Sequence, residues 1–247
     1  NVKTDSVVIK ENENGLMEEV FRNVRTNIQY MLQEGQKVIL FTSTVQGEGK
    51  SFNAANLAVS FAFMDRRTVV VGMDIRKPKL NHIFGLSGKL PGMTQFLASP
   101  SSVDLLSLCQ PTAVSPNLYV LPSGAVPPNP TELVARKSLE QAIDLLKQHF
   151  DYIILDTAPI GMVTDTRLIA RVADLSVYVC RAGYTHKNDF ELINELEQEK
   201  KLPNLCVLIN GIDMSKRKNG YYYSYGKYGK YGYGKKYGYG YGYGNEK

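Results

Sequence analysis

The chain has 247 residues, 43% of them hydrophobic and 21% charged, which is enough apolar material for one sizeable globular domain. Its net charge of +5 is unevenly placed, because residues 216–247 carry eight Lys and Arg against one Glu and are net +7, which leaves residues 1–215 at net −2. Since the globular part is not basic, we expect no nucleic acid among its partners. Three isolated cysteines disfavour a disulfide framework, three scattered histidines form no zinc-binding pattern, and the lack of an 18-residue apolar run argues against a membrane span.

The N-terminal segment is predicted to form a polar, extended lead-in over residues 1–14 and then a helix over residues 15–34. The apolar residues of this helix recur at helical spacing and are expected on one face: Val20, Val24, Ile28 and either Met31 or Leu32. Because the helix precedes the first strand, it does not cross over within the sheet and is free to serve as an added outer element.

Six short apolar runs are predicted as strands, and most of them are continuous rather than alternating, as in strands covered on both faces. They are Val38–Thr42, Thr68–Met73, Leu118–Leu121, Tyr152–Leu155, Leu175–Cys180 and Leu205–Ile209. Helical patterns near residues 50–64, 131–149, 164–172 and 187–200 alternate with these runs. The alternation predicts an α/β fold with a mostly parallel, doubly wound sheet flanked by helices.

The helix over residues 131–149 has a clear predicted start. Asn129 can cap it, Pro130 suits its first position, and Glu132 can reach back to the cap. Its buried stripe is expected to comprise Leu139, Ile143, Leu146 and Phe150.

Residues 44–51, Thr-Val-Gln-Gly-Glu-Gly-Lys-Ser, directly follow a predicted strand and open a predicted helix. In this context the segment matches a P-loop, whose backbone N–H groups and helix dipole hold phosphate oxygens. Lys50 would neutralise the terminal phosphates of ATP, and Ser51 would bind Mg²⁺. Thr44 stands where the motif has its first glycine, and the alternative is a glycine-rich turn without a ligand. The predicted nucleotide-binding residues are Gln46, Gly47, Glu48, Gly49, Lys50, Ser51 and Phe52.

Two acidic residues that follow buried strands are candidates for the same site. Asp156 ends the fourth predicted strand, where a carboxylate that organises Mg²⁺ is expected beside a P-loop, although alone it could equally cap a turn. Asp74 follows the second strand and could face the metal or an attacking hydroxyl, and Arg76 beside it could stabilise charge in the transition state. The alternative for this segment is a solvated loop of mixed charge. The predicted catalytic residues are Lys50, Asp74, Arg76 and Asp156, and the predicted metal ligands are Ser51, Asp74 and Asp156.

Beyond Ser215 the chain consists largely of Tyr, Gly and Lys and lacks the aliphatic residues that a core requires, so residues 216–247 are predicted to be disordered. A tail that repeats one chemical group suggests a substrate, since a phenol hydroxyl can accept a phosphoryl group. The candidate acceptors are Tyr221, Tyr222, Tyr223, Tyr225, Tyr228, Tyr231, Tyr233, Tyr237, Tyr239, Tyr241 and Tyr243.

These features resemble, in kind and in order, the bacterial tyrosine kinases of capsule and exopolysaccharide synthesis. The resemblance rests on the P-loop, the acid-ended second strand, Ile-Leu-Asp-Thr-Ala-Pro at 154–159, Pro-Pro-Asn-Pro-Thr-Glu-Leu at 127–133 and the tyrosine-rich tail. It implies a P-loop NTPase fold with a kinase domain over residues 15–215, and Mg²⁺- and ATP-dependent autophosphorylation of the tail between subunits. It also implies a ring-shaped homo-oligomer (an octamer), a membrane-spanning co-polymerase segment, a cognate tyrosine phosphatase, and a location at the cytoplasmic face of the bacterial inner membrane.

Residue by residue, the resemblance places the family's Walker A lysine and hydroxyl on Lys50 and Ser51 and its Walker B aspartate on Asp156. Its Walker A′ segment, with two aspartates and then an arginine, falls on Gly72, Asp74 and Arg76. The first aspartate, which the family is thought to use in deprotonating tyrosine, is therefore missing, and Asp74 is the expected substitute.

Further residues are assigned by the same resemblance. The family's oligomerisation motif, Glu-x-x-Arg-x-x-Arg, matches Glu19, Arg22 and Arg25 on the first helix, for which the alternative is an exposed salt-bridged face. Asn210 is suggested to border the adenine, or else to belong to an ordinary turn.

Two other functions remain open at this point. Gly72 could mark a lost base, which would make the chain a P-loop ATPase that only switches an assembly. A Tyr/Gly/Lys tail could also stack on nucleic-acid bases, but the negative charge of residues 1–215 disfavours that function.

Overall fold

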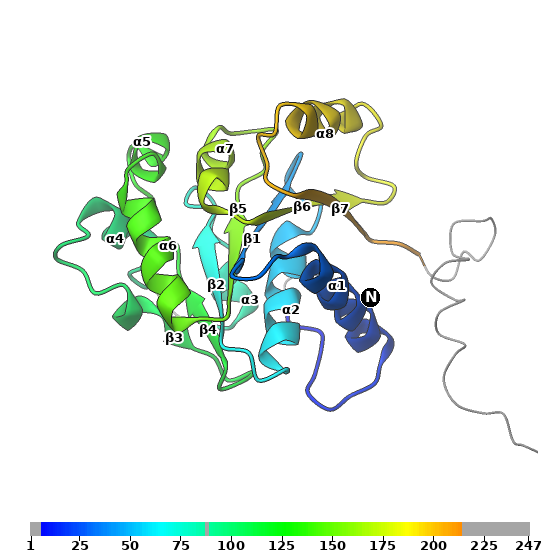
Figure 1. Ribbon diagram of the computed structural model, residues 1–247, viewed down its shortest axis with the longest axis horizontal. Coiled ribbons are helices and arrows are strands. Elements are labelled where there is room, and N and C mark those ends of the chain that lie inside the picture. Colours follow the sequence, from blue (N-terminus) through cyan, green and yellow to red (C-terminus); the bar gives the residue numbers. More distant parts are fainter. Residues whose placement is uncertain (1–5, 87–88, 214–247) are drawn as a thin grey trace, which may run out of the picture. The chain divides into compact units, whose positions relative to one another are not determined.

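A seven-stranded sheet with the order β3-β4-β2-β5-β1-β6-β7 forms the centre of the compact unit that ends at Gly211 (Figure 1). The computed structural model describes residues 6–86 and 89–213. All neighbouring strands are parallel except β3 and β4. The strands are β1 (Val38–Ser43), β2 (Thr68–Met73), β3 (Gln110–Pro111), β4 (Leu118–Leu121), β5 (Tyr152–Thr157), β6 (Leu175–Arg181) and β7 (Leu205–Asn210). The predicted α/β class and mostly parallel sheet are thus confirmed.

All six predicted runs are strands, but two features of the sheet differ from the prediction. The sheet has one strand that was not predicted, β3, whose two residues are too few to show a periodic pattern. The expectation of burial on both faces is wrong for β7, where Val207 and Ile209 are 43% and 45% exposed. Because β7 lies at the edge of the sheet, the helices that cover the central strands do not fully cover it.

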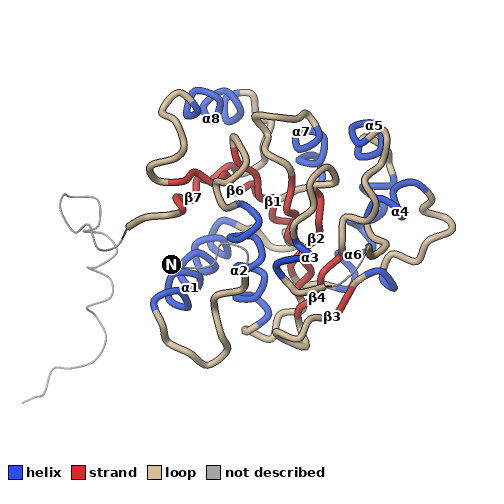
Figure 2. Tube along the Cα trace, turned by 180° about the vertical axis from the view of Figure 1, so that it is seen from behind, coloured by secondary structure: helices blue, strands red, loops and turns tan. Residues whose placement is uncertain are grey.

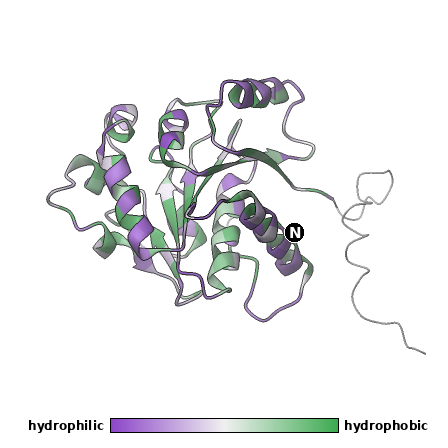
Figure 3. Cartoon of the chain, in the orientation of Figure 1, coloured by the Kyte–Doolittle hydropathy of each residue, from purple (hydrophilic) through white to green (hydrophobic). Residues whose placement is uncertain are grey.

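One face of the sheet carries α1 (Leu16–Met31), α2 (Lys50–Ala62) and α3 (Leu80–Ile83), and the view from behind in Figure 2 shows α1 beside α2. Every residue of α2 is buried, because the helix lies between the sheet and α1. The contact between α1 and α2 includes an edge-to-face pair, Phe21 and Phe52, whose ring centroids are 6.1 Å apart. Hydrophilic residues predominate along α1 (Figure 3).

The buried stripe of α1 follows the prediction at Val24, Ile28 and Leu32 but includes Phe21 in place of Val20, which is only half-buried. Phe21 and Ile28 are the buried residues, and Met17, Val24 and Leu32 pack beside them, whereas Met31 is 39% exposed. The helix also ends three residues before the predicted limit, since the backbone becomes extended at the next residue and a turn with a left-handed glycine follows.

The other face of the sheet carries a larger set of helices: α4 (Met93–Ala98), α5 (Pro130–Val134), α6 (Ser138–His149), α7 (Asp165–Ile169) and α8 (Asp189–Gln198), with short 3₁₀ turns at Leu106–Leu108 and Ala170–Val172. The predicted buried stripe of α6 is confirmed, because its four residues are at most 4% exposed. Helices on both faces therefore leave the ends of the strands as the place where loops meet.

The prediction of one helix over residues 131–149 is wrong, because the structure has two helices with a break at residues 135–137. Two side-chain hydrogen bonds hold this break: Arg171 donates to the carbonyl of Arg136 at 3.0 Å, and Ser138, the first residue of α6, donates to the carbonyl of Leu97 at 2.9 Å. Pro130 does occupy the first helical position, but the side chain of Asn129 makes no capping hydrogen bond.

The described part of the lead-in packs on α2. Ile9 is buried, and the Val8 amide donates to the side chain of Asn56 at 2.8 Å. Within residues 6–86 and 89–213, no helix is long and apolar enough to cross a membrane. The predicted tyrosine acceptors and the predicted disorder of the tail lie outside the described residues.

Candidate active site

The central strands bring the predicted site residues to one edge of the sheet. β1 lies between β5 and β6, and β5 also pairs with β2, so Phe41 and Gly72 are both at the level of Asp156. Because these strands are parallel, their carboxyl ends meet at the same edge, which is where open α/β sheets bind ligands. Residues 44–49 connect the end of β1 to the start of α2 at this edge.

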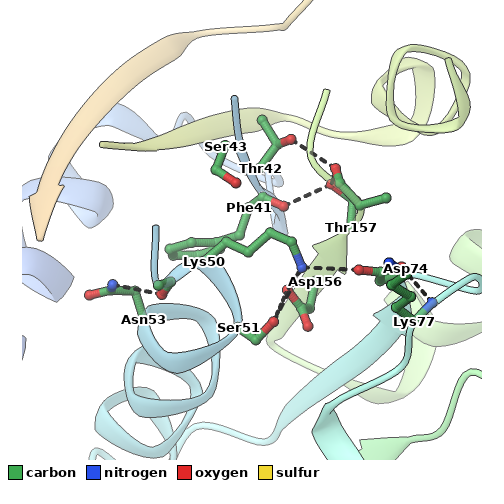
Figure 4. A network of polar contacts seen from close by, with 12 residues as sticks. Phe41, Thr42, Ser43, Lys50, Ser51, Asn53, Asp74, Lys77, Asp156 and Thr157 are labelled. Atoms are coloured by element: carbon green, nitrogen blue, oxygen red, sulfur yellow. Dashed lines mark hydrogen bonds and ion pairs between the residues drawn. The ribbon is translucent and has the colours of Figure 1, made fainter. Parts of the chain in front are cut away.

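Lys50 is the centre of a buried polar cluster (Figure 4). Its Nζ lies 3.2 Å from Oδ2 of Asp74 and 3.4 Å from Oδ1 of Asp156. The Ser51 hydroxyl donates to the same Asp156 oxygen at 3.0 Å. Four side chains from α2, the end of β2 and β5 therefore meet at one point, in agreement with the expectation that they share a site.

Burial and charge act against each other in this cluster. Burial alone would lower the pKa of Lys50, but the carboxylates of Asp156 and Asp74 outweigh it and raise that pKa. Burial raises the pKa of Asp156, and the Lys50 ammonium and Ser51 hydroxyl counteract only part of this increase. Lys50 is therefore charged at neutral pH and faces oxygen ligands.

The glycine-rich loop has the backbone that a phosphate cradle requires. Gly47 and Gly49 have φ values of 88° and 99°, in the left-handed region that favours glycine. Thr44, at the position of the motif's first glycine, has no positive φ, so the loop does not need a glycine there. Its hydroxyl instead lies 2.8 Å from that of Tyr178, which fixes the beginning of the loop.

The structure does not bring Arg76 into the cluster. Its guanidinium forms two hydrogen bonds with Asp165, at 2.7 and 3.1 Å, and one with the Thr131 hydroxyl at 3.1 Å. Burial is the largest single effect on Asp165 and opposes its ionisation, but the hydrogen bonds from Arg76 and Thr131 and the charge of Arg76 together outweigh it and lower the pKa of this carboxyl. The sequence reasoning missed Asp165, since its partner is 89 residues away in the chain.

Gly72, the position of the absent Walker A′ aspartate, has no room for a side chain. A Cβ there would lie 2.4 Å from the Ser123 hydroxyl and 2.9 Å from its backbone nitrogen. Asp74, two residues later, is buried and accepts a hydrogen bond from the Lys77 amide at 3.0 Å. Asp74 is thus the carboxylate that the second strand supplies to the site.

The other predicted site residues have distinct environments. Asn210 donates from its side-chain amide to the carbonyl of Glu48 at 2.9 Å, so it lies against the loop. The ring of Phe52 faces Phe21 on α1, which leaves only the backbone of this residue to contribute to the loop.

The predicted oligomerisation residues of α1 do not form one group. Arg22 pairs with Glu19 on the exposed side of the helix. Arg25 instead turns toward α2, where it donates to the Ser60 carbonyl at 2.6 Å. Burial lowers the pKa of the Arg25 guanidinium, and the neighbouring Arg22 charge adds to this effect.

The oxygen ligands at the site match a hard cation. Asp74, Asp156 and Ser51 offer two carboxylates and a hydroxyl, and Mg²⁺ is usually held by one or two carboxylates together with phosphate oxygens. Among residues 6–86 and 89–213, no three His, Cys, Asp or Glu side chains cluster as a metal-binding group. Phosphate oxygens of a bound nucleotide would therefore have to complete the coordination.

A glycine-rich loop between a parallel strand and a helix, followed by a buried lysine facing two strand-end carboxylates, defines the class of nucleotide-binding P-loop proteins. The solved structure of the septum site-determining protein MinD from Pyrococcus horikoshii, complexed with Mg-ADP, shares this fold. Its TM-score is 0.56 over 70% of this chain and 68% of that chain, at 24% identity.

More specific relatives identify the family. Tyrosine-protein kinase CpsD of Streptococcus pneumoniae is 39% identical over 213 residues, covering 86% of this chain and 92% of that protein. The chimerical protein CapA2B2 is 31% identical with a TM-score of 0.74, covering 82% of this chain and 88% of that one. The kinase domain of Escherichia coli tyrosine kinase ETK is 26% identical with a TM-score of 0.73, covering 91% and 80%. No family model matches the chain. The chain belongs to the family of bacterial tyrosine-protein kinases.

Proposed function

We propose that the protein is an ATP-dependent tyrosine autokinase that phosphorylates its own C-terminal tyrosine cluster between subunits. The observation that carries this proposal is the buried cluster in which Lys50 faces Asp74 and Asp156 at the start of α2. Loop residues 46–49 would hold the phosphates of ATP through their N–H groups, and the ammonium of Lys50 would neutralise the terminal phosphates. Asn210 would lie near the adenine of ATP.

The transfer would join the tyrosine oxygen to the γ-phosphorus of ATP. The bond between that phosphorus and the bridging oxygen breaks, ADP leaves, and the phenol proton passes to the carboxylate of Asp74. Asp74 is the candidate acceptor of the proton because Ser123 closely approaches Gly72 and leaves no space for a carboxylate there. Phosphoryl transfer passes through a loose transition state and depends mostly on positioning and charge, so one carboxylate is a sufficient base.

Magnesium is the metal that the donor set fits. Ser51, Asp156 and Asp74 would hold it, and when bound it would neutralise charge on the transferred phosphoryl group. Arg76 contributes indirectly in this proposal: its two hydrogen bonds to Asp165 anchor the segment that follows Asp74.

The tail of one subunit would be phosphorylated at the active site of a neighbouring subunit. Gly220 to Lys247 comprises 28 residues, which can extend to about 90 Å, so a neighbour's site is within reach. We propose that subunits assemble through α1, with Glu19 and Arg22 on its exposed side. We also propose that the chain works with a membrane-spanning co-polymerase segment and a tyrosine phosphatase in capsule or exopolysaccharide synthesis at the inner membrane. The resemblance to capsule-synthesis kinases supports these partners.

Incubation with γ-labelled ATP and Mg²⁺ tests the activity. We expect label on tyrosine in the parent chain and none in Lys50→Met, and a truncation after residue 215 should accept no label while still phosphorylating the tail of a Lys50→Met partner. Absence of label on the parent chain, with ATP still bound, would contradict the kinase and favour an ATPase that switches an assembly.

Phosphorylation should also weaken the assembly. Each phosphotyrosine adds about −1.5 to −2 charges, so about four would cancel the +7 of residues 216–247 and further ones would make neighbouring tails repel. Light scattering in ATP-free buffer should show a smaller mass for heavily phosphorylated protein, and an unchanged mass would refute this regulation.

A further inference from the structure

Side chains from the carboxyl ends of β6 and β7, and from the turn after β6, bond the backbone carbonyls of the glycine-rich loop. The Tyr184 hydroxyl donates to the carbonyl of Gln46 at 2.9 Å, and a guanidinium nitrogen of Arg181 donates to that of Gly47 at 3.0 Å. The amide of Asn210 donates to the carbonyl of Glu48 at 2.9 Å. We refer to Arg181, Tyr184 and Asn210 as the loop strap.

The loop strap bonds three consecutive peptide groups. In a trans peptide the carbonyl oxygen of one residue and the N–H of the next lie in one plane and point in opposite directions. Anchoring the carbonyls of residues 46, 47 and 48 therefore directs the N–H groups of Gly47, Glu48 and Gly49 away from the strap. These are the N–H groups that a phosphate would bind in such a loop, because consecutive N–H groups in alternating left- and right-handed conformations form an anion-binding nest.

The contacts are tight enough to restrict the loop. A Cβ on Gly49 would lie 2.0 Å from the Asn210 amide nitrogen, so only glycine admits this side chain. Glu48 is fully buried; one of its oxygens accepts from the Val45 amide at 2.9 Å, and the other accepts from the Thr185 hydroxyl. The loop is thus also bonded from within.

The loop strap is itself a connected unit. The guanidinium of Arg181 lies 5.2 Å from the ring centre of Tyr184, and the two residues are joined by a backbone hydrogen bond of 3.0 Å. The Ala182 amide donates to the carbonyl of Asn210 at 2.9 Å, which ties the end of β7 to the same turn. Tyr184 remains 46% exposed, so its hydroxyl contributes a directed contact with the loop more than core packing.

We propose that Arg181, Tyr184 and Asn210 are positioning residues that preset the N–H groups of the glycine-rich loop for the phosphates of the nucleotide. The inference rests on the proposed function, since it requires that residues 46–49 hold those phosphates. Arg181 and Tyr184 lie outside the loop. The proposal gives them an effect on nucleotide affinity that acts through the loop carbonyls they bond.

Calorimetric titration of the full chain with ADP and Mg²⁺ tests the proposal in Tyr184→Phe, Arg181→Met and Arg181→Lys. Tyr184→Phe removes only a hydroxyl, and the loss of one hydrogen bond should weaken ADP binding about threefold to tenfold. Arg181→Met should weaken it at least as much, and Arg181→Lys should recover most of the loss, because lysine retains a charged donor. The matched control is Tyr30→Phe, which removes the hydroxyl of an 85% exposed tyrosine on α1 and should leave ADP binding unchanged.

Lys50→Met and thermal unfolding of the nucleotide-free proteins separate the other outcomes. The proposal predicts that the melting temperatures of Tyr184→Phe and of the Arg181 variants fall by at most about 6 °C, the cost of one hydrogen bond. Unchanged ADP affinity in Tyr184→Phe and Arg181→Met, with binding lost in Lys50→Met, would overturn the loop strap and leave the proposed function intact. Weakened ADP binding together with a larger fall in melting temperature, neither of them recovered in Arg181→Lys, would assign these residues a purely structural role and also overturn the proposal. Normal ADP binding by Lys50→Met would instead overturn the proposed function.

Discussion

Replacement of Gly72 tests whether packing explains the missing Walker A′ aspartate. A Cβ at this buried position would lie 2.4 Å from the Ser123 hydroxyl and 2.9 Å from the Ser123 backbone nitrogen. Overpacking of this kind costs about 1–3 kcal/mol, whereas exchanging glycine for alanine at an unstrained site gains about 0.4–1 kcal/mol through the unfolded state. Steric conflict therefore wins, and we expect Gly72→Ala to lose about 1–2 kcal/mol of unfolding free energy.

The matched comparison is with Gly72→Asp. Gly72 pairs with Asp156 across β2 and β5, so an added carboxylate would lie near two others with Lys50 as their shared cation. We expect Gly72→Asp to be less stable than Gly72→Ala, because it adds charge repulsion in a buried site to the same steric conflict.

Urea denaturation of the parent, Gly72→Ala and Gly72→Asp measures these differences. In thermal unfolding, a loss of 1 kcal/mol should lower the melting temperature of a domain of this size by about 2–4 °C. Ser123→Gly should recover part of the loss in Gly72→Ala, since it removes the hydroxyl contact but leaves the backbone nitrogen. A Gly72→Ala protein as stable as the parent would refute the reasoning, because Ser123 would then yield without cost.

Three further predictions follow from contacts away from the loop. Asp165→Asn should lower the free energy of unfolding by about 1–3 kcal/mol, because Arg76 loses its carboxylate partner. Folding lowers the pKa of Asp165, so its stabilisation is present at neutral pH and is lost on acidification below the ordinary aspartate range. The urea midpoints of parent and variant should therefore converge as the pH falls. Phe21→Ala should cost about 3–5 kcal/mol in the same assay, because it removes a ring that is 1% exposed, and a loss under 1 kcal/mol would mean that α1 is only loosely packed. Arg22→Ala should keep the free energy of unfolding within about 1 kcal/mol of the parent, as for an exposed ion pair, but reduce the mass of any assembly in light scattering. Arg25→Ala should lower both the stability and the assembly mass. Unchanged stability in Arg25→Ala would contradict the contact of Arg25 with α2.

Local pattern was enough for the sheet and for the position of the loop. Continuous apolar runs identified six strands, since strands covered on both faces leave no other signal in the sequence. The strand that was missed, β3, has only two residues, and the helix predicted over residues 131–149 is interrupted by hydrogen bonds from Arg171 and Ser138. Those bonds join residues that are 35 and 41 positions apart in the chain, and no local periodicity can report such contacts.

The sequence by itself determined the class of the protein: a glycine-lysine-serine loop between an apolar strand and a helix, an aspartate at a strand end, and a tail of tyrosines all depend on residue type and short spacing. Only the tertiary structure decided which groups meet. The pairing of β2 with β5 put Asp74 beside Lys50, the approach of Ser123 explained the glycine at position 72, and Asp165 drew Arg76 away from the cluster. The physical reason is that a side chain's partner is set by strand order and packing, and these bring together residues whose distance along the chain carries no information about contact.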